Sequence, residues 1–205
     1  MQKSIIFSLI AILFFASCEN DDDKKTLVNY EISAADSHVE WWGYLREGNN
    51  HGTFSLNNDE IKTENGKVTG GAFSIPISSV NVINLEGDLK EQLEHHLLSA
   101  DFFNVALHPN VTFNIKLVTP FTEAEKEGII AGANYTVTGD LQLLGTTKEI
   151  SFPAKITVKN DNLDAEALIR INRLHWGMTY ASDPNEGMYI LPDVDLQLKL
   201  SAKKK

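Results

Sequence analysis

The chain has 205 residues, of which 42% are hydrophobic, and its 28 acidic side chains outnumber 18 Lys and Arg to give a net charge of −10. Like charge repels a phosphate backbone, so this balance argues against nucleic acid as a partner. The single cysteine, Cys18, leaves no second thiol for an internal disulfide.

The first residues have the organisation of a secretory signal peptide. A basic start at Lys3 precedes an apolar run over residues 5–15, and small residues stand directly before Cys18. The run is well short of the roughly 20 residues that a membrane-spanning helix needs. We therefore predict that residues 1–17 are a cleaved signal peptide.

Cys18 stands where a bacterial lipoprotein is cut and acylated. Residues 15–18, Phe-Ala-Ser-Cys, resemble a lipobox, with Phe15 in place of the usual Leu. The alternative is an ordinary signal peptide cleaved nearby, with Cys18 left as a spare thiol. The first interpretation predicts membrane attachment through acylated Cys18, which requires nothing of the fold because the lipid chains alone give stable anchoring.

A charged segment without core-forming residues follows the cysteine. We predict that residues 18–28 are the lipidated cysteine and a flexible tether. The acidic run at residues 21–23 is either a solvated spacer or resembles the export signal of surface-displayed lipoproteins. The predicted location is the cell envelope, as an outer-membrane lipoprotein, with surface display left open.

Apolar and polar residues alternate through much of residues 29–205. Period-two alternation is typical of strands with one buried face. Turn signals such as Asn65-Gly66 separate the strands by short connections. About eight such strands favour an all-β antiparallel barrel or sandwich, and a closed barrel has no free edges. The clearest alternating segments are residues 38–45, 135–143, 150–158, 163–171 and 194–200.

One segment departs from this alternation. Asp88 and Glu91 have the spacing of a capping box, with Asp88 as the N-cap. Leu89, Leu93 and Leu97 recur every four residues, which predicts a short amphipathic helix over residues 89–98. Its apolar stripe predicts that the helix covers an open end or a flank of the barrel.

A set of short motifs spans nearly the whole of residues 29–205. In their order and spacing, they resemble the YceI-like family of lipid-binding, lipocalin-like proteins. The chain departs from the family pattern at Ser37-His38, where members often have His-Ser, and at Asn172, where they often have Asp. The motifs are Ser37-x-Val39-x-Trp41, Gly52-x-Phe54, residues 95–103 (HHLLSADFF), residues 108–113 (HPNVTF), Val137-x-Gly139-Asp140-Leu141, residues 145–148 (GTTK) and Arg173-x-x-x-Gly177.

The resemblance implies an extended, lipocalin-like eight-stranded antiparallel β-barrel over residues 29–205, with one short inserted helix. It also implies an interior that holds an isoprenoid-type lipid, such as a quinone or a prenyl lipid, as the partner, with no other cofactor. An eight-stranded barrel is just wide enough to be filled by its side chains or to hold one slender ligand. The sequence leaves both states open.

The candidate lining of such a cavity is apolar. Inward positions on strands contribute Val39, Trp41, Phe54, Phe73 and Phe113. The helix and the loop after it contribute Leu93, Leu97, Phe102 and Phe103 as a mouth or lid. Trp176, Met178 and Tyr180 alternate and form another part of the wall. Each of these residues could instead serve only to pack the core.

Histidine spacing does not indicate a metal site. His95 and His96 are adjacent, so on a helix they point about 100° apart and cannot chelate together. His96 with Asp101 could instead act as a base and its orienter, or the two could cap the end of the helix. Arg173 could bind a phosphate or form an ion pair.

We therefore predict a non-catalytic protein that carries or sequesters an isoprenoid-type lipid. The alternative is a surface interaction module with a filled barrel, whose partners bind loops around Asn49, residues 123–128 and residues 183–187. A weak hydrolase-like enzyme centred on His96 is the third possibility.

Overall fold

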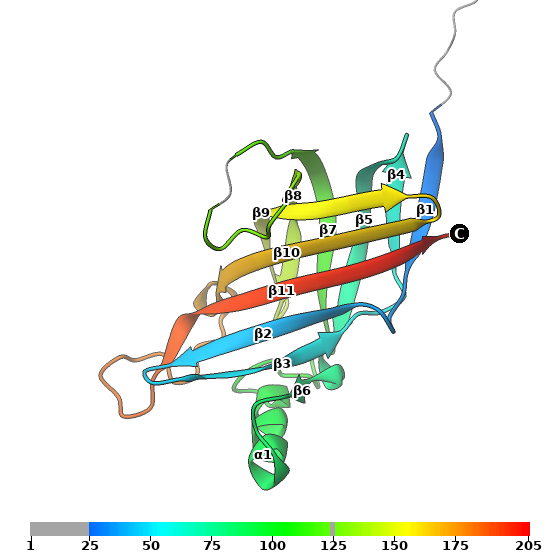
Figure 1. The fold of residues 1–205 in the computed structure, drawn as a ribbon. Coiled ribbons are helices and arrows are strands. Elements are labelled where there is room, and N and C mark those ends of the chain that lie inside the picture. Colours follow the sequence, from blue (N-terminus) through cyan, green and yellow to red (C-terminus); the bar gives the residue numbers. More distant parts are fainter. Residues whose placement is uncertain (1–24, 124–125) are drawn as a thin grey trace, which may run out of the picture.

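The computed structural model describes residues 25–123 and 126–205. The predicted signal peptide, Cys18 and the acidic run at residues 21–23 lie outside the described residues. In the described part, the strands form one antiparallel sheet that curls into a barrel, with a single α-helix at one end (Figure 1).

Strands make up most of the fold. They are β1 Leu27–Ile32, β2 His38–Leu45, β3 Asn49–Ser55, β4 Glu60–Glu64, β5 Lys67–Pro76, β6 Asn81–Val82, β7 Asn110–Pro120, β8 Tyr135–Leu143, β9 Thr146–Lys159, β10 Asn162–Asn172 and β11 Ile190–Lys204. Helix α1 spans Gly87–Leu98, and short 3-10 helices span Ile77–Ser79 and Arg173–Trp176. None of the described helices is long and apolar enough to span a bilayer. Strand β1 begins at Leu27, inside the segment predicted as tether.

Eight strands close into a ring in the order β1-β4-β5-β7-β8-β9-β10-β11. Pairing of Tyr30 with Lys204 and of Ile32 with Ala202 joins β1 to β11 and closes the ring. The predicted eight-stranded antiparallel barrel is therefore confirmed. Strands β2, β3 and β6 continue from β11 and extend the sheet beyond the closed ring (Figure 1).

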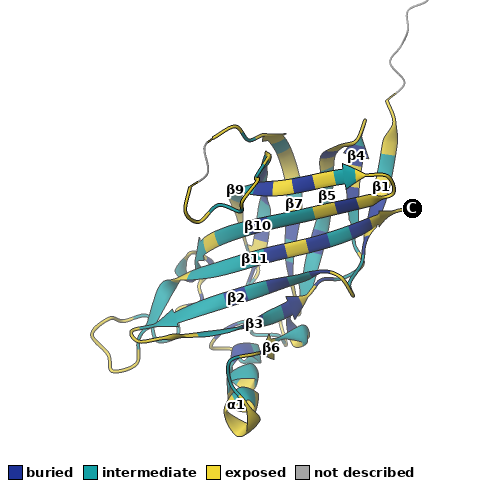
Figure 2. Ribbon diagram, in the orientation of Figure 1, coloured by how far each residue is buried: buried dark blue, intermediate teal, exposed yellow. Residues whose placement is uncertain are grey.

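The alternation places the hydrophobic core inside the barrel, as predicted. In β8, Val137, Leu141 and Leu143 are buried, and the intervening positions are less buried. Figure 2 shows buried and exposed residues alternating along β9 and along the parts of β10 and β11 nearest the C-terminus. Toward the extended end of the sheet, inward residues such as Leu196 are only half-buried, which indicates that the interior is less filled there.

The hairpin predicted at Asn65-Gly66 is present. Both residues have positive φ, 51° and 75°, as a two-residue type I′ turn requires. Two connections are longer than predicted, at residues 121–134 and 177–189. In the first, the Phe121 N–H donates to the Asn134 carbonyl oxygen at 2.9 Å, so the loop leaves and re-enters the sheet at one point.

Helix α1 starts earlier than predicted. Glu86 is the N-cap residue, without a side-chain cap, so the predicted capping box centred on Asp88 is wrong. Asp88 lies instead in the first turn, where its negative charge interacts favourably with the helix dipole. Leu89 is 63% exposed and Leu97 is buried, so only the C-terminal part of the apolar stripe packs on the barrel.

Gly71 gives a sharp test of the β4–β5 pairing. Its φ is +117°, and a Cβ there would lie 2.4 Å from the Glu60 carbonyl oxygen. Gly71→Ala is expected to destabilise the fold by about 2 kcal/mol or more, because a strained backbone and a clash add together. Gly70→Ala is the control, since its Cβ would meet nothing closer than 4.0 Å. Chemical unfolding of both variants measures the difference, and equal stabilities would contradict the assigned pairing.

Candidate functional site

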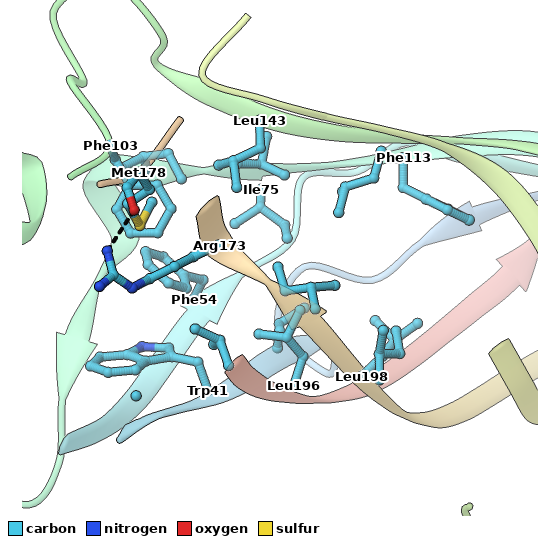
Figure 3. Close-up of a pocket in the computed structure, with 18 of the residues that line it drawn as sticks. Trp41, Phe54, Ile75, Phe103, Phe113, Leu143, Arg173, Met178, Leu196 and Leu198 are labelled. Atoms are coloured by element: carbon cyan, nitrogen blue, oxygen red, sulfur yellow. Dashed lines mark hydrogen bonds between the residues drawn. The ribbon is translucent and has the colours of Figure 1, made fainter. Parts of the chain in front are cut away.

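An apolar cavity of about 160 Å³ lies inside the barrel, toward its extended end (Figure 3). Every residue that lines it is apolar or glycine except Arg173. A cavity of about 150 Å³ with similar walls stays dry and binds small apolar molecules. The cavity can therefore exclude water and accept a hydrocarbon group, but it offers little to bind a polar one.

The structure brings nine of the eleven predicted lining residues together around this cavity. They come from strands β2, β3, β5 and β7, from α1 and the loop after it, and from the turn that follows the second 3-10 helix. The nine are Val39, Trp41, Phe54, Phe73, Leu97, Phe102, Phe103, Phe113 and Met178.

Leu93 and Trp176 do not line the cavity. Leu93 is half-buried and packs against the core from α1. Trp176 is buried, and its indole Nε1 donates to the Leu141 carbonyl oxygen at 3.2 Å. Trp176, Met178 and Tyr180 do alternate with more exposed neighbours, as predicted. Trp176 ends a 3-10 helix, however, and Gly177 (φ 84°) then turns the chain, so that of the three only Met178 lines the cavity. Tyr180 instead packs edge-on against His96, with ring centroids 4.7 Å apart.

Several lining residues were not among the predicted site residues. The alternation already placed most of them on the inner face, but it did not show which part of each strand borders a cavity. That information depends on how the strands are staggered against one another. The additional residues are Gly43, Ile75, Ile77, Val111, Leu141, Leu143, Ile150, Phe152, Ile169, Ile171, Arg173, Ile190, Val194, Leu196 and Leu198.

The turn after α1 presents two phenylalanines to the cavity. The Phe103 N–H donates to the Leu97 carbonyl oxygen at 3.0 Å, which folds the turn back on the helix end. Phe103 packs edge-on against Phe54 of β3, with centroids 5.5 Å apart. Phe102 is buried and also borders the cavity. The two rings thus fasten the helix to the barrel and also form one wall of the cavity.

Among the described residues that line the cavity, Arg173 is the one that is charged, and it is only 2% exposed. Its guanidinium donates to the carbonyl oxygens of Met178, Ile190 (2.8 Å) and Leu191 (3.2 Å). The ion pair predicted for Arg173 is therefore wrong, because backbone carbonyl oxygens take the place of a carboxylate partner. Burial lowers the pKa of Arg173 below its ordinary value. These hydrogen bonds hold the two ends of the 178–190 segment together beside the cavity.

Trp41, one of the lining residues, carries an unpaired polar group. Its indole N–H is buried and has no acceptor among the described residues. A buried donor without a partner is costly and rare in folded proteins. Figure 3 shows Trp41 and Arg173 toward the same end of the cavity, with Phe113 and Leu198 toward the other.

The His96–Asp101 pair lies beside the cavity but not on its wall. His96 Nε2 is 3.0 Å from Asp101 Oδ2, and the imidazole packs edge-on against Phe102. In the described part of the chain, neither residue lines the cavity. Within residues 25–123 and 126–205, no group of three or more His, Cys, Asp or Glu side chains is arranged to hold a metal ion.

An extended eight-stranded antiparallel barrel with an apolar interior cavity defines a lipocalin-like protein. More specifically, the chain belongs to the YceI-like domain family, which matches residues 30–202. It is 28% identical to a UPF0312 protein of Pectobacterium atrosepticum and 26% identical to the protein YceI of Escherichia coli O157:H7. Each of these matches covers 98% of this chain and 90% of the relative.

Two solved structures share the fold. The crystal structure of Burkholderia cenocepacia BcnA has a TM-score of 0.66 at 16% identity, covering 84% of this chain and 99% of that protein. A polyisoprenoid binding domain from Saccharophagus degradans, implicated in plant cell wall breakdown, has a TM-score of 0.62 at 10% identity, covering 86% and 98%. At these identities, the likeness shows the fold alone.

Arg173→Met is expected to lower the free energy of unfolding by about 2–4 kcal/mol, because it strips the donor from three carbonyl oxygens near the cavity. The control is Arg170→Met, since Arg170 pairs with Asp195 on the exposed face of the barrel. An exposed ion pair contributes about 1 kcal/mol or less. Chemical denaturation of both variants tests the difference. A smaller loss for Arg173→Met than for Arg170→Met would contradict the structural role assigned to Arg173.

Proposed function

We propose that this protein binds an isoprenoid-type lipid, such as a quinone or a prenyl lipid, in the barrel cavity and carries or sequesters it without changing it chemically. The observation that carries the proposal is the wholly apolar wall of the cavity, apart from Arg173. Ligand sites of this kind are concave and apolar, with few polar groups that orient the ligand. The structural likeness to a polyisoprenoid binding domain supports the same class of ligand.

The size of the cavity favours a slender ligand. Its volume of about 160 Å³ is below the roughly 300–1,000 Å³ of typical small-molecule sites. A linear chain with a small head group enters such a space lengthwise, whereas a rigid polycyclic ligand such as a sterol does not. Met178, which adapts its shape easily, and the Phe102 and Phe103 turn are the parts of the wall that would shift to admit it.

Trp41 would orient the polar end of the ligand. A quinone carbonyl or a prenyl hydroxyl oxygen can accept the hydrogen bond that the Trp41 N–H lacks. The isoprenoid tail would then extend toward Phe113, at the other end of the cavity (Figure 3). In this orientation, the buried Trp41 N–H gains an acceptor, and the isoprenoid tail contacts only the apolar wall of the cavity.

We further propose that the protein acts in the cell envelope as an outer-membrane lipoprotein, held by acyl chains on Cys18. The lipobox-like residues 15–18 and the charged segment after them support this proposal. The acidic run at residues 21–23 is the candidate signal for surface display. A tethered carrier would remain beside the membranes in which isoprenoid lipids dissolve.

Lipid uptake is tested with a pair of variants on β3. Phe54 lines the cavity, and its neighbour Thr53 does not. Phe54→Gln is expected to weaken binding of farnesol or a quinone at least about tenfold, because an amide without a partner is costly in an apolar cavity. Thr53→Gln should bind as the unaltered chain does. Native mass spectrometry of the Cys18→Ser protein measures uptake without signal from anchor lipids.

Further variants separate the rival functions. His96→Ala should leave lipid uptake nearly unchanged, because His96 does not line the cavity. If the unaltered protein turns over the bound lipid and His96→Ala abolishes that turnover, the enzyme interpretation displaces the carrier. If His96→Ala abolishes uptake, the polar mouth rather than the apolar wall selects the ligand, and the case for chemistry at His96 reopens. If the unaltered protein neither co-purifies with lipid nor takes up added prenyl alcohol or quinone, the interaction module is the better account.

Anchoring is tested by replacing the acylated residue. The unaltered mature protein is expected to begin at Cys18, to carry acyl chains in its intact mass and to partition into detergent. Cys18→Ser should lose the acyl chains and the partitioning into detergent, because the domain itself supplies no anchor in this scheme. A Cys18→Ser protein that stays with the membrane, alongside an unaltered protein without acyl chains, would refute lipidation.

A further inference from the structure

A second, smaller cavity of about 40 Å³ lies in the closed part of the barrel. Its lining is also apolar except for Glu166, and it includes Ala154 and Ala165. Four residues border both this cavity and the larger one: Phe73, Phe113, Phe152 and Leu198. The two spaces are therefore neighbours separated by a thin layer of side chains.

Three of these four residues form a continuous aromatic layer, which we name the phenylalanine partition: Phe73, Phe113 and Phe152. The ring centroids of Phe73 and Phe113 are 5.3 Å apart, and those of Phe113 and Phe152 are 5.5 Å apart. These separations are typical of packed aromatic pairs. Phe113 is the central member, and only 2% of it is exposed.

Gly139 fixes the position of the central ring. A Cβ at Gly139 would lie 2.5 Å from Phe113 Cζ, so the ring rests directly on the bare backbone of β8. Strand register places Gly139 opposite Ile115, two residues along β7 from Phe113. The ring is thus supported by the backbone on one side and by two aromatic rings on the others.

We propose that the phenylalanine partition is a length stop for the bound lipid: it ends the larger cavity and limits how much of an isoprenoid tail the barrel takes in. The inference rests on the proposed lipid-binding function and adds a selectivity to it. In Figure 3, Phe113 closes the end of the cavity remote from Trp41 and Arg173. A tail that enters from the Trp41 end therefore meets the partition last.

The smaller cavity, behind the phenylalanine partition, is suited to a further part of the isoprenoid tail. Residues such as Val137, Ile156 and Leu163 continue the apolar lining there. Removing one ring of the partition would join the two cavities and open this lining to the tail. Each further methylene group buried then favours the longer ligand.

The test compares a series of prenyl alcohols of increasing length: geraniol, farnesol, geranylgeraniol and solanesol. The full-length Cys18→Ser protein binds each in turn, and native mass spectrometry with competition gives the relative affinities. Phe113→Leu and Phe152→Leu should each shift the preferred length upward. The affinity for geranylgeraniol should rise about tenfold relative to that for farnesol, as expected from burying roughly two more methylene groups.

Two controls separate selectivity from loss of stability. Leu56→Ala removes a buried side chain that lines neither cavity, so it should lower stability and leave the order of preferred lengths unchanged. Ala154→Leu fills the smaller cavity, so adding it to Phe113→Leu should restore the original order. Phe152→Leu provides an independent variant where Phe113→Leu does not fold.

The outcomes distinguish this inference from the function on which it rests. If the unaltered protein binds no prenyl alcohol, both fail. If it binds them and the partition variants keep its order of lengths, the length stop is wrong and lipid binding stands. A shift that Ala154→Leu does not reverse would also overturn the inference, because the longer tail would then not occupy the smaller cavity.

Discussion

The barrel depends on the pairing of β11 along both of its edges. One edge pairs with β10 from Asn172 to Asn162, and the other pairs first with β2 and then with β1. Only three residue pairs, from Tyr30–Lys204 to Ile32–Ala202, close the ring. The change of partner from β2 to β1 therefore decides where the closed barrel ends and where the extended sheet begins.

Ser37 stabilises this change of partner. Its Oγ accepts from the Ser201 N–H at 3.0 Å and donates to the Ser201 carbonyl oxygen at 3.2 Å. It thereby takes the place of a strand partner at a position where β1 has ended and β2 has not begun. Because this position is buried, the Ser201 N–H would otherwise lack a partner, whereas the Ser201 carbonyl oxygen also accepts from the Ser33 N–H at 2.8 Å. The Ser37-His38 departure from the family pattern thus has a structural use in this chain.

Alternation in the sequence predicted the fold class well, because a one-residue change of register would turn every apolar side chain outward. It could not predict where the interior is hollow. Val194 and Leu196 alternate as regularly as Leu198 and Leu200, yet only the second pair is fully buried. The difference arises from how distant strands are staggered. The ion pair expected for Arg173 failed for a related reason, since its partners are backbone carbonyls that have no signature in the sequence.

Asn172 shows why a departure from a family pattern need not disturb the structure. Its Oδ1 accepts from the Leu174 N–H at 3.0 Å and caps the 3-10 helix that carries Arg173. An amide oxygen and a carboxylate oxygen can both fill this role, because only an acceptor is needed. With Asn, however, no negative charge is added beside the buried guanidinium. Among the described residues, the Arg173 guanidinium donates to backbone carbonyl oxygens, at the end of the cavity where the Trp41 N–H lacks an acceptor. In the proposed carrier, the two ends of the cavity would therefore act on different parts of the ligand: the Trp41 N–H would orient its head at one end, and the packed phenylalanine rings would limit the length of its tail at the other.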